Sequence, residues 1–293
     1  MKERAKILIA YDGSACSDAA LDDLKRAGLP AAVEAVVVTV ADILLPPPCD
    51  QLRDAEAHAM HISESERQAQ AHAERAVEEA RALAERAGKL LKADFPDWEV
   101  RAEVRCDAPA WAVVKLADQI NPGLVVVGSH GHSVVGGRLI LGSVSQRVLY
   151  EARCSVRVAR CSGERRAGPV RIVVGFNGSP DAEAAVKEVS SRTWPEGSEA
   201  RVIVARASLK PEAPGAAVER LRAAGLFASE VDRDGDAAHV LIREAGEWGA
   251  DSIFVGTRNL HGFQHLLHGS VSSAVAAGAQ CSVEVVRPAG GAA

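Results

Sequence analysis

The sequence predicts an α/β protein with two tandem domains, each a five-stranded parallel sheet flanked by helices. Three observations support this prediction. The chain has 293 residues, and at roughly 150 residues per domain this is enough for two domains that each bury a core. Several segments occur twice in the same order. Short runs of β-branched residues alternate with helical stretches, as in βαβ units with parallel strands buried on both faces. One oversized barrel is the alternative.

The internal repeat is the strongest of these observations. Residues 6–14 match residues 171–179 at an offset of 165, whereas the later matches have offsets of 127 or 128. The later pairs are 127–129 with 255–257, 141–145 with 268–272, and 154–156 with 281–283. Ordered matches of this kind indicate a duplication. The fall in offset from 165 to about 127 places roughly 38 extra residues in the first copy, between its first and second matching segments.

The copies are predicted to form domains 1–161 and 169–293, joined by a polar linker rich in turn formers. Helix starts are marked in both. Ser179 is an N-cap followed by a proline at the first helical position, and Ser14 is expected to cap the equivalent helix. The predicted strands lie near residues 5–11, 34–41, 99–105, 123–128 and 154–160, and near 170–176, 200–206, 227–232, 251–256 and 281–287.

The extra residues of the first copy include a long stretch rich in Ala, Glu and Arg, from about 51 to 93. Its apolar residues between Ala76 and Leu91, Leu90 among them, recur at helical spacing, so we expect an amphipathic helix that packs on the sheet. A role in binding a partner is the alternative.

Composition and charge exclude several classes of protein. Lys and Arg number 34 against 39 Asp and Glu, a net charge of −5, so neither a nucleic-acid surface nor a membrane surface is expected. No apolar run is long enough to span a bilayer, and the apolar stretch at 7–10 is too short for a signal peptide. Six cysteines without metal-ligand spacing indicate a reducing compartment. We expect a cytoplasmic protein.

A glycine-rich pattern after one apolar strand is the main candidate for chemistry. Gly128 and Gly131 follow the strand at 124–127, and Gly142 with Ser143 then opens a helix. Glycines let the backbone approach a ligand closely, and a helix N-terminus suits phosphate oxygens. In an open parallel sheet, ligands bind at the carboxyl ends of the strands. Asp12 ends the first strand and is expected at the same crevice.

These residues resemble those of the universal stress protein family in its tandem, two-domain form. The resemblance covers nearly the whole chain and implies Rossmann-like domains with strand order 3-2-1-4-5. It also implies that the first domain binds ATP, with magnesium carried by the phosphates. By position, the adenosine would contact Asp12 and the backbone at Val40, the ribose and phosphates would contact Gly128 and Gly131, and the phosphates would contact Gly142, Ser143 and Ser145.

The second copy departs further from the family pattern. Asn177 replaces the acid and Asn259 replaces the second glycine. In the first copy, the spacer between the second and third glycines holds ten residues where the family usually has nine. The lost carboxylate makes the first copy the favoured ATP site. The candidates carried over to the second domain are Asn177, Gly256, Gly269 and Ser270.

Catalysis is not predicted, because glycine loops with serines supply no evident base for hydrolysis. The resemblance implies a stress-response sensor or switch. A slow ATPase and a nucleotide-free interaction scaffold are the alternatives. The resemblance also implies that the last strands, 154–160 and 281–287, pair edge to edge within one chain, and that the protein forms homo-oligomers.

Other candidate residues carry weaker signals. His261, His265 and His268 have helical spacing, but no nearby carboxylate or cysteine completes a metal site, so no metal is expected. His130 and His132 lie in the first glycine loop, where phosphate contact and solvent exposure are the alternatives. The repeated cysteines at 154 and 281 are interpreted as packing residues.

Overall fold

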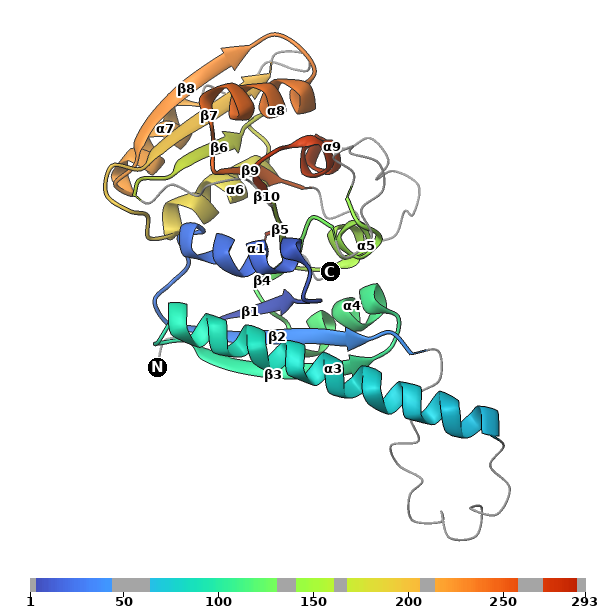
Figure 1. Ribbon diagram of the computed structural model, residues 1–293. Helices are drawn as coiled ribbons and strands as arrows, with labels where there is room; N and C mark the ends of the chain where they lie inside the picture. Colours follow the sequence, from blue (N-terminus) through green and yellow to red (C-terminus); the bar gives the residue numbers. More distant parts are fainter. Residues whose placement is uncertain are drawn as a thin grey trace.

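In the computed structural model, the described residues are 4–43, 64–130, 141–160, 168–205, 214–257 and 271–288. Within them, ten strands form one continuous sheet in the order β3-β2-β1-β4-β5-β10-β9-β6-β7-β8 (Figure 1). The first half contributes β1 (Ala5–Ala10), β2 (Val33–Ala41), β3 (Glu99–Cys106), β4 (Leu124–Gly128) and β5 (Ser155–Ala159). The second half contributes β6 (Arg171–Gly175), β7 (Glu199–Ala205), β8 (Phe227–Arg233), β9 (Ser252–Gly256) and β10 (Ser282–Val286).

Each half has the strand order 3-2-1-4-5, and the strand pairs within each half are parallel. The predicted fold class and strand order are therefore confirmed. The two halves meet where β5 pairs with β10 in antiparallel orientation, with Val156 opposite Val285. The predicted edge-to-edge pairing of the last strands is also confirmed. Most of the predicted linker, residues 161–167, lies outside the described residues.

Helices cover both faces of the sheet, but the two faces differ. One face carries a single apolar core that runs through both halves. The other face carries two separate apolar cores, one in each half. The first face is covered by α4 (Pro109–Ile120), α5 (Ser143–Glu151), α8 (Ala237–Trp248) and α9 (Val271–Gly278). The other face is covered by α1 (Ala15–Asp23), α3 (Glu64–Asp94), α6 (Pro180–Ser191) and α7 (Gly215–Ala223). A short 3₁₀ turn follows α1.

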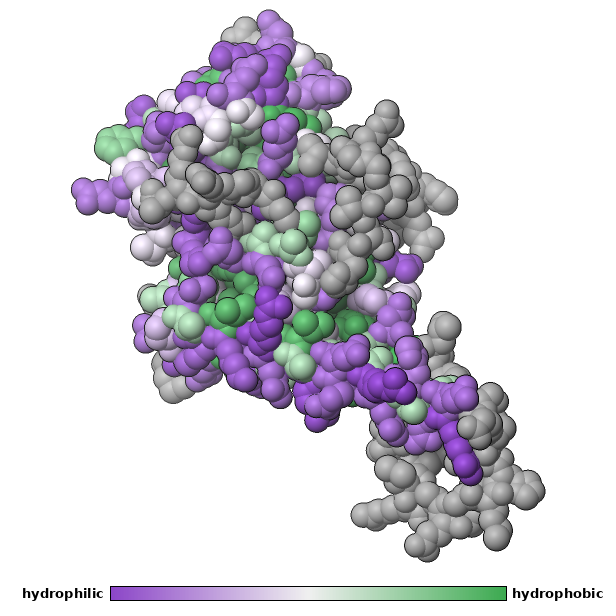
Figure 2. Space-filling model, in the orientation of Figure 1, coloured by the Kyte–Doolittle hydropathy of each residue, from purple (hydrophilic) through white to green (hydrophobic). Residues whose placement is uncertain are grey.

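The long predicted helix is present as α3, and residues 51–63 of the prediction lie outside the described residues. Ala84, Ala87 and Leu91 are buried against the sheet, which confirms the amphipathic packing. Leu90 was wrongly placed on the buried face and is 43% exposed. The amino-terminal part of α3 extends past the sheet (Figure 1), and the surface in this region is largely hydrophilic (Figure 2).

A network of buried charges lies at the seam between β5 and β10. Arg157 is 1% exposed, and it donates hydrogen bonds to Asp23 Oδ2 at 2.5 Å and to Glu284 Oε2 at 3.2 Å. Arg192 donates to the same Glu284 oxygen at 3.0 Å, and the Ser282 hydroxyl donates to Asp23 at 2.8 Å. Burial alone would lower the pKa of the Arg157 guanidinium. The carboxylates of Asp23 and Glu284 raise this pKa by more than burial lowers it, so the pKa lies above its usual value. Each of these buried charges contacts an opposite charge.

At its two ends the seam is symmetric. Arg160 donates a hydrogen bond to the Ala276 carbonyl on α9 at 2.5 Å. Arg287, at the matching position of the second copy, donates to the Leu149 carbonyl on α5 at 2.5 Å. An arginine from each half thus binds the carboxyl-terminal part of a helix from the other half. Cations are favoured at this end of a helix by the helix dipole.

At its centre the seam is asymmetric. Arg157 lies directly opposite Glu284 in the strand pair. The two residues also occupy matching positions of the repeat, 127 residues apart. Two identical copies would place like charges against each other here, and both would be buried. The duplicated chain places an arginine against a glutamate instead, so the pairing of unlike halves is electrostatically favoured.

The repeated cysteines also lie near this seam. Cys281 is part of the continuous apolar core, and Cys154 packs against it, which confirms their interpretation as packing residues. Burial raises the pKa of the Cys154 thiol to about 11 and that of Cys281 to about 12. Both thiols are therefore protonated at neutral pH and poorly nucleophilic.

We expect Arg157→Met to lower the free energy of unfolding by about 3–5 kcal/mol, because it removes the cation that Asp23 and Glu284 share in the interior. Urea denaturation followed by circular dichroism measures the change. Arg81→Met is the matched control. It removes one partner of an exposed pair with Glu78 on α3 and should change stability by less than about 0.5 kcal/mol. Equal effects of the two substitutions would contradict the importance given to the seam.

Candidate functional site

A cavity of about 390 Å³ opens at the carboxyl ends of β1, β2 and β4. The strand order reverses between β1 and β4, which is where ligands bind in open α/β sheets. The walls of the cavity come from the β1–α1 loop, the end of β2, and the starts of α4 and α5. The predicted site residues that line it are Asp12, Val40, Gly128, Gly142, Ser143 and Ser145.

Further lining residues were not predicted from the sequence. Tyr11 and Asp42 follow the ends of β1 and β2, so the rule that places ligands at strand ends could have found both. Pro109 and Val113, from α4, carry no local signal. His130, considered for phosphate contact, does line the cavity, whereas Gly131 and His132 lie outside the described residues.

The β1–α1 loop fixes the position of Asp12. Its Oδ1 accepts hydrogen bonds from the Ser14 amide at 3.0 Å and the Ser14 hydroxyl at 2.6 Å. The Ser14 hydroxyl oxygen in turn accepts from the Ser17 amide at 3.2 Å, which confirms Ser14 as the N-cap of α1. Gly13 has φ +77°, and a Cβ there would lie 2.7 Å from Leu83 on α3, so this turn requires glycine.

Tyr11 joins the cavity wall to α3. Its hydroxyl donates to Asp18 Oδ1 at 2.5 Å, and Arg86 of α3 donates to the other Asp18 oxygen at 3.1 Å. Burial, together with the hydrogen bond to Asp18, raises the pKa of Tyr11 to about 12. The phenol is therefore protonated at neutral pH and acts as a hydrogen-bond donor.

The amino terminus of α5 forms the opposite wall. Gly142 is its N-cap, with φ −62° and ψ 156°, and glycine has no side chain that could cap the helix. The first-turn amides of a helix have no partners within the helix and lie at the positive end of its dipole. The Ser145 hydroxyl donates to the Gly128 carbonyl at 2.6 Å and so holds α5 against β4. The main-chain amides of α5 are thus the groups of this wall that could bind an anion.

Gly128 has a packing role that the sequence pattern did not indicate. A Cβ at this position would lie 2.9 Å from the carbonyl carbon and oxygen of Cys16, on α1. At the matching Gly256, a Cβ would lie 2.0 Å from the carbonyl oxygen of Asp181, on α6. In both halves, the glycine that ends the fourth strand allows a helix to approach the sheet.

The second half repeats the turn without the charge. Asn177 Oδ1 accepts from the Ser179 amide at 3.1 Å, as Asp12 does from Ser14, and the Ser179 side chain caps α6 as predicted. In the part of the chain that the structure describes, no cluster of three or more His, Cys, Asp or Glu side chains could hold a metal. The predicted residues that lie outside this part are Gly269, Ser270, Asn259, His261, His265 and His268.

Comparison with known proteins agrees with this architecture. A profile of the Universal stress protein family matches residues 3–160 and 170–287. A universal stress protein from Mycolicibacterium smegmatis is 30% identical over 220 residues, which cover 64% of this chain and 69% of that protein. A crystal structure of a universal stress protein from Archaeoglobus fulgidus superposes with a TM-score of 0.67 over 96% of both chains, at 19% identity.

A universal stress protein from Mycobacterium tuberculosis is 47% identical over a shorter stretch of 68 residues, which is 23% of this chain. That stretch covers 22% of the length of the mycobacterial relative.

The doubly wound sheets and the cavity at their strand ends define a tandem α/β protein of the Rossmann-like class. The family profile covers most of the chain, so the chain belongs to the universal stress protein family, in a tandem arrangement. Within the described ranges, no helix is long and apolar enough to cross a membrane.

We expect Gly256→Ala to destabilise the protein more than Gly128→Ala, because the new Cβ would meet backbone at 2.0 Å rather than 2.9 Å. Each substitution should lower the free energy of unfolding by about 1–3 kcal/mol, measured by guanidinium denaturation. Gly246→Ala on α8 is the matched control. Nothing lies within 4 Å of its Cβ position, so stability should stay the same or rise by up to about 1 kcal/mol. A stable Gly256→Ala variant would contradict the close approach of α6.

Proposed function

We propose that the first half binds ATP and that the protein acts as a stress-response sensor or switch, in which nucleotide occupancy alters a surface read by a partner. The observation that carries this proposal is the cavity at the ends of β1 and β4, which gathers six of the residues that the family pattern assigns to nucleotide. Its volume of about 390 Å³ lies within the range of small-molecule sites.

In this proposal the phosphates bind at the amino terminus of α5. Gly142 and Ser143 line the cavity there, and the uncapped first turn offers main-chain donors together with the positive end of the helix dipole. Gly131 and the Ser145 main chain belong to the same phosphate-binding set. Magnesium is carried by the phosphates, because Mg²⁺ keeps several waters and binds substrate phosphates rather than a cage of protein ligands.

The adenosine binds at the other wall, against Asp12 and the main chain at Val40. The Asp12 carboxylate is an acceptor for the amino or hydroxyl groups of adenosine, and the turn with Ser14 holds it in place. A hydrogen bond to a charged acceptor contributes about 1.5–3 kcal/mol, more than one to a neutral amide. The second half has Asn177 at this position, so we assign ATP to the first half.

The proposed role is binding without efficient turnover. Hydrolysis requires a base or a water-orienting group beside the γ-phosphate. Among the described cavity residues, the carboxylates of Asp12 and Asp42 lie at the ends of β1 and β2, on the wall assigned to adenosine, and His130 Nδ1 lies 3.1 Å from the hydroxyl of Ser129. We therefore assign none of these groups as a base at the amino terminus of α5.

We expect Asp12→Asn to weaken ATP binding at least about tenfold, which corresponds to 1.4 kcal/mol. The fold should be unchanged, because Asn177 supports the same turn in the second half. Calorimetric titration with ATP and magnesium measures the affinity, and chromatography of denatured protein measures any nucleotide that co-purifies. Asn177→Asp is the matched control and should leave the first site unaltered. If millimolar ATP neither binds nor raises the melting temperature of the wild-type chain, the scaffold alternative holds instead.

Gly142→Asp separates binding from folding. The φ and ψ at Gly142 are accessible to any residue, and an aspartate N-cap stabilises a helix by only about a few tenths of a kcal/mol relative to glycine. Its carboxylate would repel a phosphate at the same place. We therefore expect ATP binding to be lost while thermal stability is kept or raised, as measured by titration and thermal melting. Undiminished binding would contradict the assignment of the phosphates to α5. Phosphate release by the wild type that this variant lacks would indicate an ATPase.

A further inference from the structure

β3 is the outermost strand of the sheet in the first half, and within the described residues its main chain pairs only with β2. An open strand edge presents unpaired amide and carbonyl groups, so it is a template for another strand. Natural proteins commonly protect such an edge. The eight residues of β3 provide no proline or glycine that would interrupt pairing.

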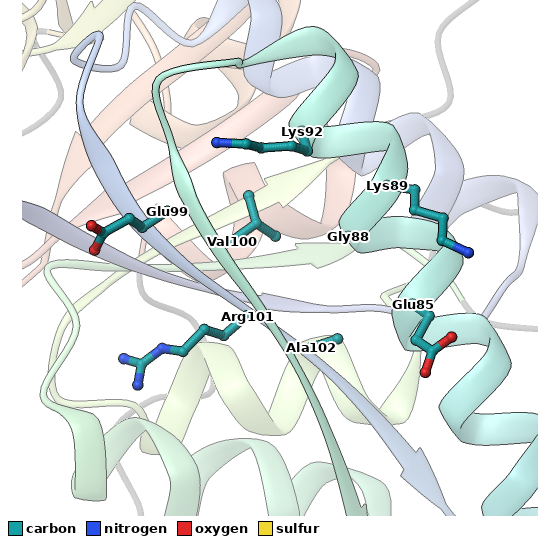
Figure 3. Close-up of a pocket in the computed structure, with 8 residues that line it drawn as sticks. All are labelled: Glu85, Gly88, Lys89, Lys92, Glu99, Val100, Arg101 and Ala102. Atoms are coloured by element: carbon teal, nitrogen blue, oxygen red, sulfur yellow. The ribbon is translucent and has the colours of Figure 1, made fainter.

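A groove of about 650 Å³ lies beside this edge, between β3 and α3 (Figure 3). Val100 and Ala102 line it from the strand, and α3 lines it with Gly88 and with the charged residues Glu85, Lys89 and Lys92. Glu99 and Arg101 point away from α3 (Figure 3). The two faces of β3 therefore differ: one is apolar and borders the groove, and the other is charged.

The charged face of β3 alternates in sign. From the start of the strand, every second residue is charged, in the order Glu99, Arg101, Glu103, Arg105. In an antiparallel pair of two β3 strands centred on Ala102, Glu99 would face Arg105 of the second copy, and Arg101 would face Glu103. Opposite charges at directly facing positions stabilise a strand pair, and like charges destabilise it. The strand is thus complementary in charge to a second copy of itself.

The same pairing also matches the apolar face. Val100 would face Val104 of the second copy, and Ala102 would face its own counterpart at the two-fold axis. Such an interface is isologous, and it closes on itself as a dimer.

β8, the opposite end of the ten-stranded sheet, provides the contrast. An antiparallel pair of β8 strands centred on Glu230 would place this residue against itself, and a pair centred on Val231 would place Glu230 against Asp232. Both registers bring carboxylates together. The charges of β8 therefore protect its edge, whereas those of β3 favour pairing.

The charged side chains of β3 can exchange partners at little cost. Within one chain, Arg101 pairs with Glu34, and Arg105 pairs with Glu103 at 2.7 Å. The arginines of these pairs are exposed and the carboxylates are half-buried, and ion pairs near the surface contribute little to stability. A second copy offers the same partners along with main-chain hydrogen bonds, which supply the affinity when a strand is added to a sheet edge.

We infer that β3 is a self-association surface, at which a second copy of this chain adds its own β3 in antiparallel orientation with Ala102 on the two-fold axis. The inference is independent of nucleotide binding. It predicts a reversible dimer of the full chain in which the two sheets are continuous.

Sedimentation velocity of the full chain over a range of micromolar concentrations tests this inference. We expect a dimer in the wild type. Arg101→Glu would set a carboxylate against Glu103 at two related positions and should weaken the dimer by at least about tenfold. Adding Glu103→Arg to this variant restores opposite charges across the axis and should restore the dimer. Arg220→Glu, at an exposed position of α7 beside β8, is the matched control and should have no effect.

Several outcomes would overturn the inference. They are a monomer at every concentration, an oligomer that Arg101→Glu leaves intact, and a folded double variant that does not regain the dimer. Circular dichroism verifies the fold of each variant. Should the double variant fail to fold, Glu103→Arg alone provides a separate test, because it sets two arginines against each other and must also weaken the dimer.

Discussion

The antiparallel pairing of β5 with β10 is the constraint on which the rest of the structure depends. It converts two five-stranded sheets into one and allows an apolar core to run across both halves on one face. On the other face, the two cores are separate, and the space at the seam holds the ion pairs of Arg157 with Asp23 and Glu284. Buried charges are expensive unless paired, so the seam is stable only when both halves are present and correctly aligned.

The seam also supports the candidate site, although the cavity lies at the strand ends of the first half. Asp23, near the end of α1, is held by Arg157 and Ser282, and the same helix carries Ser14 at its start, beside Asp12. The last turn of α5 is held by Arg287, and its first turn lines the cavity. The second half thus holds α1 through Ser282 and α5 through Arg287, two of the helices that shape the cavity. This gives the second copy a physical role even where its own nucleotide motif has diverged.

The duplication has allowed the two halves to become unlike at matching positions. A dimer of identical chains must place the same residue on both sides of its axis. In this chain the central position holds Arg157 in one copy and Glu284 in the other, and they lie face to face. This charge complementarity disfavours the pairing of two first halves or of two second halves, because two arginines or two glutamates would then face each other in the interior. Fusion of the copies makes such asymmetry possible.

The sequence was informative where the signal is local and uninformative where it depends on a distant partner. Most of the strands were predictable because they are short apolar runs, whereas the pairing at the seam was expected only from the resemblance to the universal stress protein family. The burial of Arg157 could not be predicted, since a charged residue within a strand normally faces solvent and only the fold brings Asp23 beside it. Leu90 was misplaced because helical spacing defines an apolar stripe more broadly than the sheet covers it.

The glycine motif shows why such partial predictions need a structural test. From the sequence, Gly128 was attributed to the close approach of a ligand. Its matching residue, Gly256, is also a glycine, although the second half lacks the acid. In both halves this glycine permits a helix to contact the end of the strand. This glycine therefore does not discriminate a nucleotide-binding half from an empty one. The groups that differ are the Asp12 carboxylate and the amide at Asn177, which make the same turn with different charge. In the proposed function, the preference of ATP for the first half therefore rests on that one substitution among the described residues, while the amino terminus of α5 supplies the donors for phosphate.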